Sequence, residues 1–356
     1  MPRYVVREQP ESDLLRDIAH YPFFVQRLLS SRGIHSKEAA EEFFTPVYTR
    51  DLHDPFLLKD MEKAVERILS AIEKKESIVI YSDYDADGIP GGAMLRSFFD
   101  TISYERVKNY IPHRHDEGFG LHTDAVESLA KEGANLIITI DCGIGDIAAA
   151  EVAKKHGVDL IITDHHESGE VLPDAYAIID HKQPGCSYPE QILCGAGVAF
   201  KLVQAMLSRN RFGLKEGYEK WLLDLVGIAT LSDMVPLTGE NRALAHFGLM
   251  VLRKSPRPGL QAMWKKLRIN QRYIEEDDIG FSFSPRINAA SRMGHPMDAF
   301  HLLFAKNEGD ALSAVECLES LNKERKTVVA QTVSADLLAI DTLLNEADPT
   351  YSPSQI

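Results

Sequence analysis

The hydrophobic pattern of the chain changes its period near residue 76. Residues 59–75 place apolar side chains at helical spacing, which predicts an amphipathic helix. From residue 77 onward, short β-branched runs take over, at 77–82, 107–111, 135–140, 159–163 and 175–179. Helical stretches separate them at 91–100, 122–132 and 147–156. Near-continuous apolar strands that alternate with helices predict an α/β fold, with a parallel β-sheet flanked by helices on both faces.

The pattern is helical again after the last strand. Helices are expected over 197–207 and 217–230, and residues 310–346 continue without proline or glycine. The last stretch predicts one helix roughly 50 Å long, at about 1.5 Å per residue. We therefore divide the chain into an N-terminal helical region (1–75), an α/β domain (76–305), a long helix (306–346) and a polar tail (347–356).

Composition and charge limit the class of protein. With 356 residues and 44% hydrophobic content, the chain can bury a core and is not mostly disordered. Its four cysteines form no CxxC pair, which argues against a disulfide scaffold and a structural zinc site and favours a reducing compartment, hence the cytoplasm. No signal peptide or membrane span is expected. The net charge of −14 argues against a protein that coats nucleic acid, although residues 253–272 carry seven Lys or Arg and no acid.

Acidic side chains follow three of the predicted strands. The first strand is followed by Asp83, Asp85 and Asp87, the third by Asp141, and the fourth by the segment 164–166 with sequence DHH. The carboxyl ends of parallel strands share one edge of the sheet, where ligands bind. If the first segment stays extended, its three carboxylates point the same way and raise each other's pKa values unless cations neutralise them. Carboxylates with imidazole and no thiolate suit Mn²⁺ or Mg²⁺, and more than four ligands suggest two ions.

Each of these motifs has a simpler interpretation when taken alone. An isolated DxD is usually a solvated loop or a helix cap, and a His-His pair is usually surface or core. The first segment also resembles a calcium loop, but Gly91, Gly92 and Leu95 occupy the later ligand positions and no closing glutamate follows. Three acid-terminated strands together favour a metal centre over these separate explanations.

The ordered motifs resemble a known family. DYDADG (83–88), TIDCG (139–143) and DHH (164–166) are similar to the first three motifs of the DHH phosphoesterase superfamily. Further segments resemble its RecJ branch, the single-strand-specific 5′→3′ DNA exonucleases; they are YIPHRHDEGFGL (110–121), CGAGVAFKL (194–202), ATLSDMVPL (229–237), GENR (239–242) and SPRINAA (284–290). The resemblance extends over roughly residues 25–340.

The resemblance implies roles for individual residues. The metal-ligand positions are Asp83, Asp85, Asp87, Asp141, His165 and Asp233, with Asp141 as the bridge between two ions and part of the catalytic centre. His166 would face the scissile phosphate as the second catalytic residue. The expected phosphate-binding residues are Arg114, Ser284 and Arg286, followed by Arg292 and His295. The basic segment 253–272 would follow the DNA backbone.

The same resemblance implies a Mn²⁺- or Mg²⁺-dependent exonuclease of DNA repair and recombination, which releases 5′-mononucleotides from single-stranded DNA. RecJ proteins continue past their long helix into a DHHA1 domain and an OB-fold. Neither is expected here, so a protein partner is a candidate source of the missing DNA-binding domains, and the long helix would be a connecting helix. Two alternatives stay open: a phosphodiesterase for short oligonucleotides or cyclic dinucleotides, and a non-catalytic DNA-binding scaffold of replication or repair.

Overall fold

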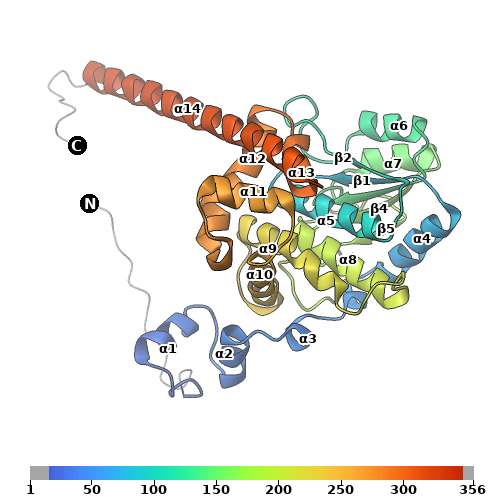
Figure 1. Ribbon diagram of the computed structural model, residues 1–356, viewed down its shortest axis with the longest axis horizontal. Helices are drawn as coiled ribbons and strands as arrows, with labels where there is room; N and C mark the ends of the chain where they lie inside the picture. Colours follow the sequence, from blue (N-terminus) through green and yellow to red (C-terminus); the bar gives the residue numbers. More distant parts are fainter. Residues whose placement is uncertain (1–15, 348–356) are drawn as a thin grey trace.

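A parallel sheet forms the centre of the molecule. The computed structural model describes residues 16–347, with side chains up to residue 336, so the predicted tail from 348 and the first 15 residues of the N-terminal region lie outside the described part. The sheet has five strands in the order β2-β1-β3-β4-β5, and all its pairs are parallel (Figure 1). The strands are β1 (Ile78–Ser82), β2 (Val107–Tyr110), β3 (Leu136–Ile140), β4 (Asp159–Thr163) and β5 (Ala177–Ile179). The predicted α/β architecture is confirmed.

Helices cover both faces because consecutive apolar residues of a strand point to opposite sides. Val79 and Tyr81 of β1 join one core with α6 (Thr123–Lys131) and α7 (Ile147–Lys155). Ile78 and Ile80 join the larger core on the other face. The helices of that face are α4 (Met61–Lys74), α5 (Gly88–Thr101) and α8 (Gly195–Arg209). Both faces are therefore buried, as the unbroken apolar runs predict.

A helical layer continues the larger core. It contains α9 (Leu223–Ser232), α10 (Gly239–Leu252), α11 (Pro258–Leu267), α12 (Ser284–Met293) and α13 (Met297–Phe304), with short turns η2 (Tyr218–Leu222), η3 (Gln271–Tyr273) and η4 (Asp278–Phe283). The single helix predicted over 217–230 is thus divided between η2 and α9. Helices α9 and α10 approach closely, since a Cβ on Gly227 would lie 2.7 Å from the Cα of Gly248.

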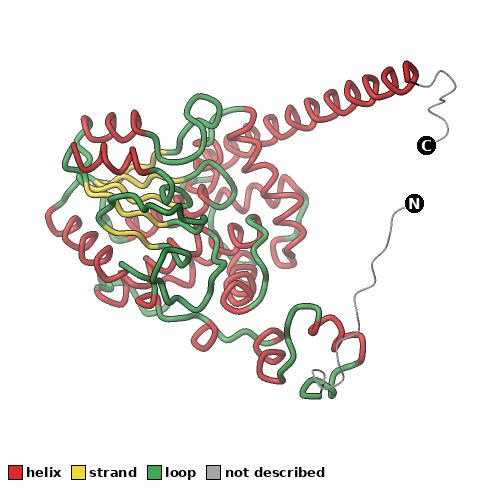
Figure 2. Tube along the Cα trace, turned by 180° about the vertical axis from the view of Figure 1, so that it is seen from behind, coloured by secondary structure: helices red, strands yellow, loops and turns green. Residues whose placement is uncertain are grey.

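The long helix is α14 (Glu308–Ala347), with 40 residues. Its first turns bury Ala311, Val315 and Leu318 against the helical layer, whereas residues 326–336 are exposed and the helix projects away from the rest of the molecule (Figures 1 and 2). Within residues 16–347, no helix is both long and apolar enough to cross a membrane.

A small helical unit precedes α4. It consists of α1 (Phe23–Ser30), α2 (Lys37–Phe44), α3 (Tyr48–Asp51) and η1 (Pro55–Leu57). Its own core contains Ile18, Leu29, Ile34 and Ala40. Arg242 of α10 joins it to the main body, because its Nε donates a hydrogen bond to the carbonyl of Phe43 (3.1 Å).

Candidate metal centre

The register of the sheet aligns the acidic residues that follow its strands. Ser82 is paired with Ile140, Ile140 with Thr163, and Thr163 with Ile179. The next residue of each strand is therefore an aspartate in the same row, namely Asp83, Asp141, Asp164 and Asp180. The strand order reverses between β1 and β3, which is where an open parallel sheet forms its ligand crevice. Asp83 and Asp141 lie at this point.

The segment 83–88 is a turn, so the expectation of an extended strand end was wrong. Strand β1 ends at Ser82, and Asp87 is the N-cap of α5. The Asp85 Oδ1 accepts the backbone N–H of Asp87 (2.7 Å) and of Gly88 (3.0 Å). The turn still gathers the acids, because α5 begins directly over the edge of the sheet.

The N-terminus of α8 closes the centre from the other side. Asp87 accepts the N–H of Gly195 at Oδ2 (2.6 Å) and of Ala196 at Oδ1 (2.8 Å). A Cβ on Gly195 would lie 2.5 Å from the Cβ of Asp141, so only glycine fits at this position. The free N–H groups of a helix N-terminus favour a carboxylate there.

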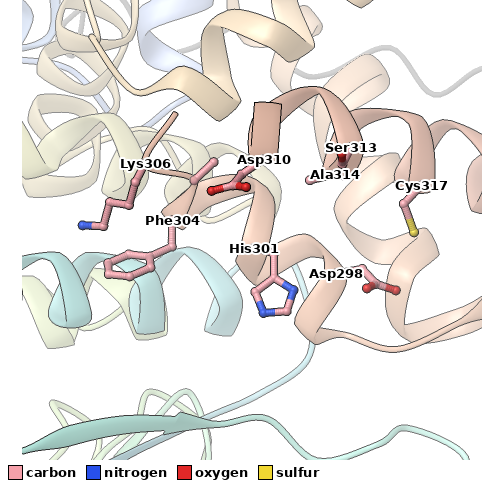
Figure 3. A pocket seen from close by; sticks show the side chains of 9 residues that line it. Asp298, His301, Phe304, Lys306, Asp310, Ser313, Ala314 and Cys317 are labelled. Carbon is pink, nitrogen blue, oxygen red and sulfur yellow. The ribbon is translucent and has the colours of Figure 1, made fainter. Parts of the chain in front are cut away.

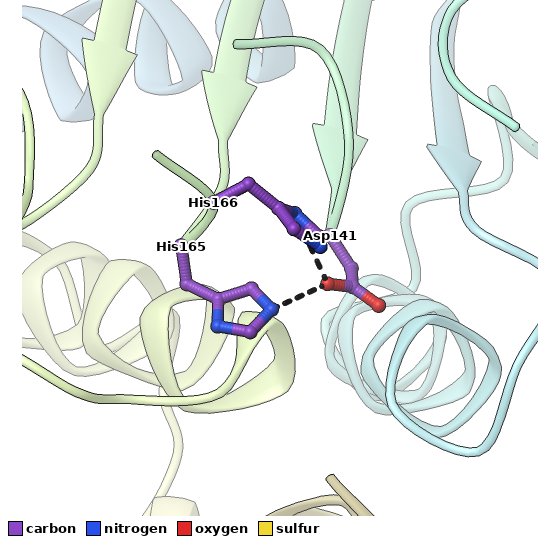
Figure 4. A group of neighbouring side chains, drawn as sticks. All are labelled: Asp141, His165 and His166. Atoms are coloured by element: carbon purple, nitrogen blue, oxygen red, sulfur yellow. Dashed lines mark ion pairs between the residues drawn. The ribbon is translucent and has the colours of Figure 1, made fainter. Parts of the chain in front are cut away.

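The six predicted metal ligands converge. Atoms within 4.8 Å of one another form three groups: Asp141 with His165 and His166, Asp87 with His165 and Asp233, and Asp83 with Asp85 and Asp141. The His165 Nε2 lies 3.0 Å from Asp141 Oδ1 (Figure 4). The Nδ1 of His165 lies 3.9 Å from Asp233 Oδ2. Asp141 and His165 each belong to two groups, which is the arrangement that adjacent cations would share.

The acidic groups are hard to ionise together in this space. Burial and the neighbouring Asp85 raise the pKa of Asp83 to about 8 and that of Asp233 to about 6. Burial and the charge of Asp233 raise the pKa of Asp87. Burial and the charge of Asp87 raise the pKa of Asp141. The Oδ1 atoms of Asp83 and Asp141 are buried and accept no hydrogen bond from the described residues. Divalent cations would satisfy these oxygens and offset the repulsion, so the donor set fits Mn²⁺ or Mg²⁺.

His165 has the properties of a neutral ligand. Burial and the neighbouring His166 lower its pKa to about 4. The imidazole is therefore uncharged at neutral pH, as a metal-binding histidine must be.

Asp164 holds His166 in place, a role that the sequence did not reveal. Its Oδ1 lies 2.8 Å from Nδ1 of His166, and its Oδ2 accepts the N–H of Ile144 (2.9 Å). Burial opposes ionisation of Asp164, but its bond to His166 and its backbone donors outweigh burial and lower the pKa. The same bond raises the pKa of His166, so its half-exposed ring carries positive charge more readily. The acidic first letter of the DHH motif was the signal for this role.

Among the predicted phosphate-binding residues, Arg114 and Arg292 keep their charged groups unpaired in the described part of the chain, whereas Ser284 and His295 are hydrogen-bonded within the protein. Arg114 lies over the ring of Tyr84, 4.7 Å from its centroid, and neither Arg114 nor Arg292 makes an ion pair within residues 16–347. Ser284 faces the centre, because its Oγ bonds to the Oγ of Ser232, next to Asp233. His295 accepts the N–H of Met297.

Arg286 lies on a different face of α12. Residues 284 and 288 share one helix face, and Asn288 Oδ1 accepts the N–H of Ala86 in the acidic turn 83–88 (2.9 Å). Arg286, two positions after Ser284, instead pairs with Glu319 of α14 and donates to the carbonyl of Ser282. Asn288 is a further supporting residue that was not predicted.

The basic segment 253–272 is partly engaged within the protein. Arg253 donates to the carbonyl of Ile274, Arg257 pairs with Asp224 (2.8 Å), and Lys266 pairs with Glu316 (2.7 Å). These three contacts lie within the helical layer or join it to α14. Binding of the DNA backbone by this segment, as predicted, would therefore depend on its other Lys and Arg side chains.

A separate cavity of about 480 Å³ lies between α13 and the start of α14 (Figure 3). Asp298, His301 and Cys317 line it, together with Lys306. Burial and Asp298 raise the pKa of the Cys317 thiol, which leaves it a poor nucleophile. None of the six metal-ligand candidates lines this cavity, so the acidic centre is the reactive site that the described residues support.

Comparison with known proteins agrees with this geometry. The model of the DHH family, N-terminal domain, matches residues 77–230. The single-stranded-DNA-specific exonuclease RecJ of Bacillus subtilis (strain 168) is 39% identical over 327 residues, which cover 91% of this chain and 40% of that protein. A crystal structure of exonuclease RecJ bound to manganese superposes with a TM-score of 0.71 at 32% identity, covering 78% of this chain and 69% of that one.

The chain belongs to the RecJ branch of the DHH family. RecJ from Thermus thermophilus in complex with Mn²⁺ gives a TM-score of 0.72 at 29% identity, over 86% of this chain and 43% of that chain. The chain spans about half the length of the curated RecJ relatives that it matches. The family assignment made from the motifs is therefore confirmed, together with the fold.

Proposed function

We propose that this chain is a metal-dependent phosphodiesterase that removes nucleotides from the 5′ end of single-stranded DNA and releases 5′-mononucleotides. The observation that carries the proposal is the convergence of the six ligand residues, with two buried carboxylate oxygens that accept no hydrogen bond from the described residues. The names and bound ions of the RecJ relatives support the same activity and cofactor.

The residues that would hold Mn²⁺ or Mg²⁺, as two ions, are those of the three groups described above: Asp83, Asp85, Asp87, Asp141, His165 and Asp233. Asp141 belongs to two of these groups and is the residue that two cations would share. When bound there, divalent cations would polarise the phosphoryl oxygens and lower the pKa of a water molecule, which would attack phosphorus.

His166 has the second chemical role. Its ring lies beside the centre, with Nδ1 4.0 Å from Asp141 Oδ1, and Asp164 keeps it oriented. A ring whose pKa is raised can stabilise the negative charge that develops on the phosphoryl oxygens. No side-chain nucleophile is needed, because water is the attacking group.

The strand is recognised beside the metal centre. Arg114 and Arg292 have no ion-pair partner among the described residues, so their guanidiniums are free to bind a terminal phosphate. Phe119 lies beside His166, with ring centroids 5.4 Å apart, and its side chain is exposed. A nucleobase can stack on such a ring. All four cysteines are free thiols, which is compatible with a cytoplasmic location.

The experiment is a digestion of single-stranded DNA and RNA of two lengths, labelled at the 5′ or the 3′ end, with Mn²⁺, Mg²⁺ or a chelator. We expect 5′-labelled DNA to release labelled mononucleotide at once in Mn²⁺, while 3′-labelled DNA shortens gradually. The chelator should stop both reactions. Intact DNA at high protein concentration with either metal would overturn the proposal, and faster cleavage of dinucleotides than of long strands would favour the short-oligonucleotide alternative.

A further inference from the structure

Two segments that are distant in sequence meet beside the metal centre. One is the loop 111–121 that follows β2, and the other is the end of α12 with the start of its connection to α13 (residues 292–294). His113 Nε2 lies 3.2 Å from the carbonyl oxygen of Gly294, and His115 Nε2 lies 3.0 Å from that of Arg292. Carbonyl oxygens only accept, so both imidazoles donate. Two histidines of one loop thus bind two carbonyls within three residues of the other segment.

Two further side chains lie beside the ring of His113, although its Nδ1 makes no hydrogen bond with the described residues. Its Nδ1 lies 2.7 Å from Oδ2 of Asp116, and the ring of His295 approaches to 5.6 Å between centroids. The backbone of the loop is fixed independently, because Glu117 accepts the N–H of His113 (2.6 Å) and the hydroxyl of Tyr110 (2.5 Å). The loop therefore has support of its own besides the histidine bonds.

The far end of the loop is also anchored without the histidines. The Tyr81 hydroxyl donates to the carbonyl of Gly120 (3.0 Å), and the N–H of Leu121 donates to Asp146 (2.6 Å). A Cβ on Gly120, whose φ is +102°, would lie 2.9 Å from the Asp146 carboxylate. Removing the histidine bonds should therefore loosen the contact between the segments and leave the loop and the fold in place.

Each joined segment carries one unpaired guanidinium. Arg114 stands between the two histidines in sequence and lies over Tyr84, which is adjacent to Asp83 of the metal centre. Arg292 bears the carbonyl that His115 binds. The join thus brings the two arginine positions together at the edge of the centre. Two guanidiniums suit a terminal phosphate monoester, which carries more negative charge and more free oxygens than an internal diester.

We propose that His113 and His115 are positioning residues, which clasp the 111–121 loop to residues 292–294 and so set Arg114 and Arg292 as a paired site for the terminal phosphate of the strand. The inference rests on the proposed function for the identity of the strand. It adds two positioning residues behind the phosphate-binding arginines, and their contribution is measured as the preference for a 5′-phosphorylated end over a 5′-hydroxyl end.

The test is equilibrium binding of a 3′-labelled deoxyoligonucleotide with either a 5′-phosphate or a 5′-hydroxyl, in chelator, so that no hydrolysis is required. We expect the wild-type protein to prefer the phosphorylated end. The double variant His113→Ala/His115→Ala should lose about tenfold of this preference, since each lost hydrogen bond weakens the positioning modestly. His113→Gln/His115→Gln, whose amides can still donate, should recover part of it.

Matched controls separate positioning from general damage. His156→Ala, an exposed histidine at the end of α7, should leave the preference unchanged. Arg114→Ala/Arg292→Ala should abolish the preference even with the clasp intact. In Mn²⁺, the clasp variants should raise KM for the phosphorylated strand and leave kcat and the rate on the hydroxyl strand nearly unchanged.

Several results would overturn the clasp. The first is a wild-type protein that binds both strand ends equally well. The second is a histidine variant that keeps the wild-type preference for the 5′-phosphate. The third is a histidine variant whose affinity for both oligonucleotides falls by the same factor. Failure of the proposed function is a different result, because a protein that prefers the phosphorylated end in chelator and hydrolyses nothing in Mn²⁺ keeps the clasp and loses the exonuclease.

Discussion

The Nε2 of His165 lies 3.0 Å from Oδ1 of Asp141, although His165 comes 24 residues later in the chain. The contact exists because β3 and β4 are neighbours in parallel register, with Asp141 the first residue after β3 and His165 the second residue after β4. A buried carboxylate beside a neutral imidazole is poorly stabilised by the protein alone. Bound cations would therefore stabilise this pair.

Replacing Asp141 with asparagine should separate activity from stability. Asp141→Asn keeps the shape and the left-handed backbone (φ +64°), which asparagine tolerates, and removes one carboxylate from the crowded centre. We expect hydrolysis in Mn²⁺ to fall at least about 100-fold, because even the outer partners of metal ligands typically contribute 10–100-fold. The melting temperature of the metal-free protein should rise or stay unchanged. Activity close to wild type would contradict the bridging role.

Metal-free protein should lose stability as the pH rises. The folded-state pKa of Asp83 is raised to about 8 and that of Asp233 to about 6, whereas in the unfolded chain both are about 3.9. The folded state therefore binds more protons between about pH 4 and pH 8, and the free energy of unfolding falls across this window. Urea titrations in chelator at pH 5.5 and pH 8 test this directly.

Divalent metal should cancel that dependence, because bound cations stabilise the ionised carboxylates. Mn²⁺ is expected to raise the melting temperature more at pH 8 than at pH 5.5. The variant Asp83→Asn should show a shallower pH dependence in chelator. A metal-free protein that is equally stable at both pH values would show that the acids do not repel one another as described.

Gly195 should be required for activity more than for folding. A Cβ at this position would approach the Cβ of Asp141 to 2.5 Å and displace its carboxylate. We expect Gly195→Ala to reduce kcat about 100-fold, since a displacement of about 1 Å can cost that much. Gly197→Ala is the matched control in the same helix, because its nearest neighbour would be the Sγ of Cys194 at 3.5 Å, an ordinary contact. Equal activity of the two variants would refute the steric argument.

The buried ion pair between Lys201 and Glu240 should contribute to the stability of the fold and not to hydrolysis. The Lys201 Nζ lies 2.7 Å from Glu240 Oε1, both side chains are fully buried, and Glu240 also accepts the hydroxyl of Tyr188 (2.5 Å). Glu240→Gln leaves an uncompensated buried cation, and we expect it to lower the free energy of unfolding by about 3–5 kcal/mol. Urea unfolding measures this loss, with hydrolysis of the remaining folded protein unaffected.

A double variant shows whether the two groups act as a pair. Lys201→Met/Glu240→Gln should be less destabilised than the sum of its two single variants, because neither charge remains unpaired. Strict additivity in this cycle would mean that the charges do not interact.

The sheet and most of the metal centre follow from local patterns in the sequence. Runs such as 135–140 are apolar at nearly every position, and a strand buried on both faces is what allows this. The acids that follow these runs had to lie at one edge of the sheet, because all carboxyl ends of parallel strands do. The family motifs added Asp233, which no strand pattern could have placed.

The way in which the side chains meet is a property of the folded chain alone. Asp87 depends on the N–H groups of α8, more than 100 residues later, and the face that Arg286 presents depends on where α14 packs. The support of His166 by Asp164 and the bonds of His113 and His115 depend on close approach between segments. Hydrophobic periodicity is a local property that fixes which residues are buried. Contacts between polar groups are formed by packing across the chain, so they follow only once the whole core is assembled.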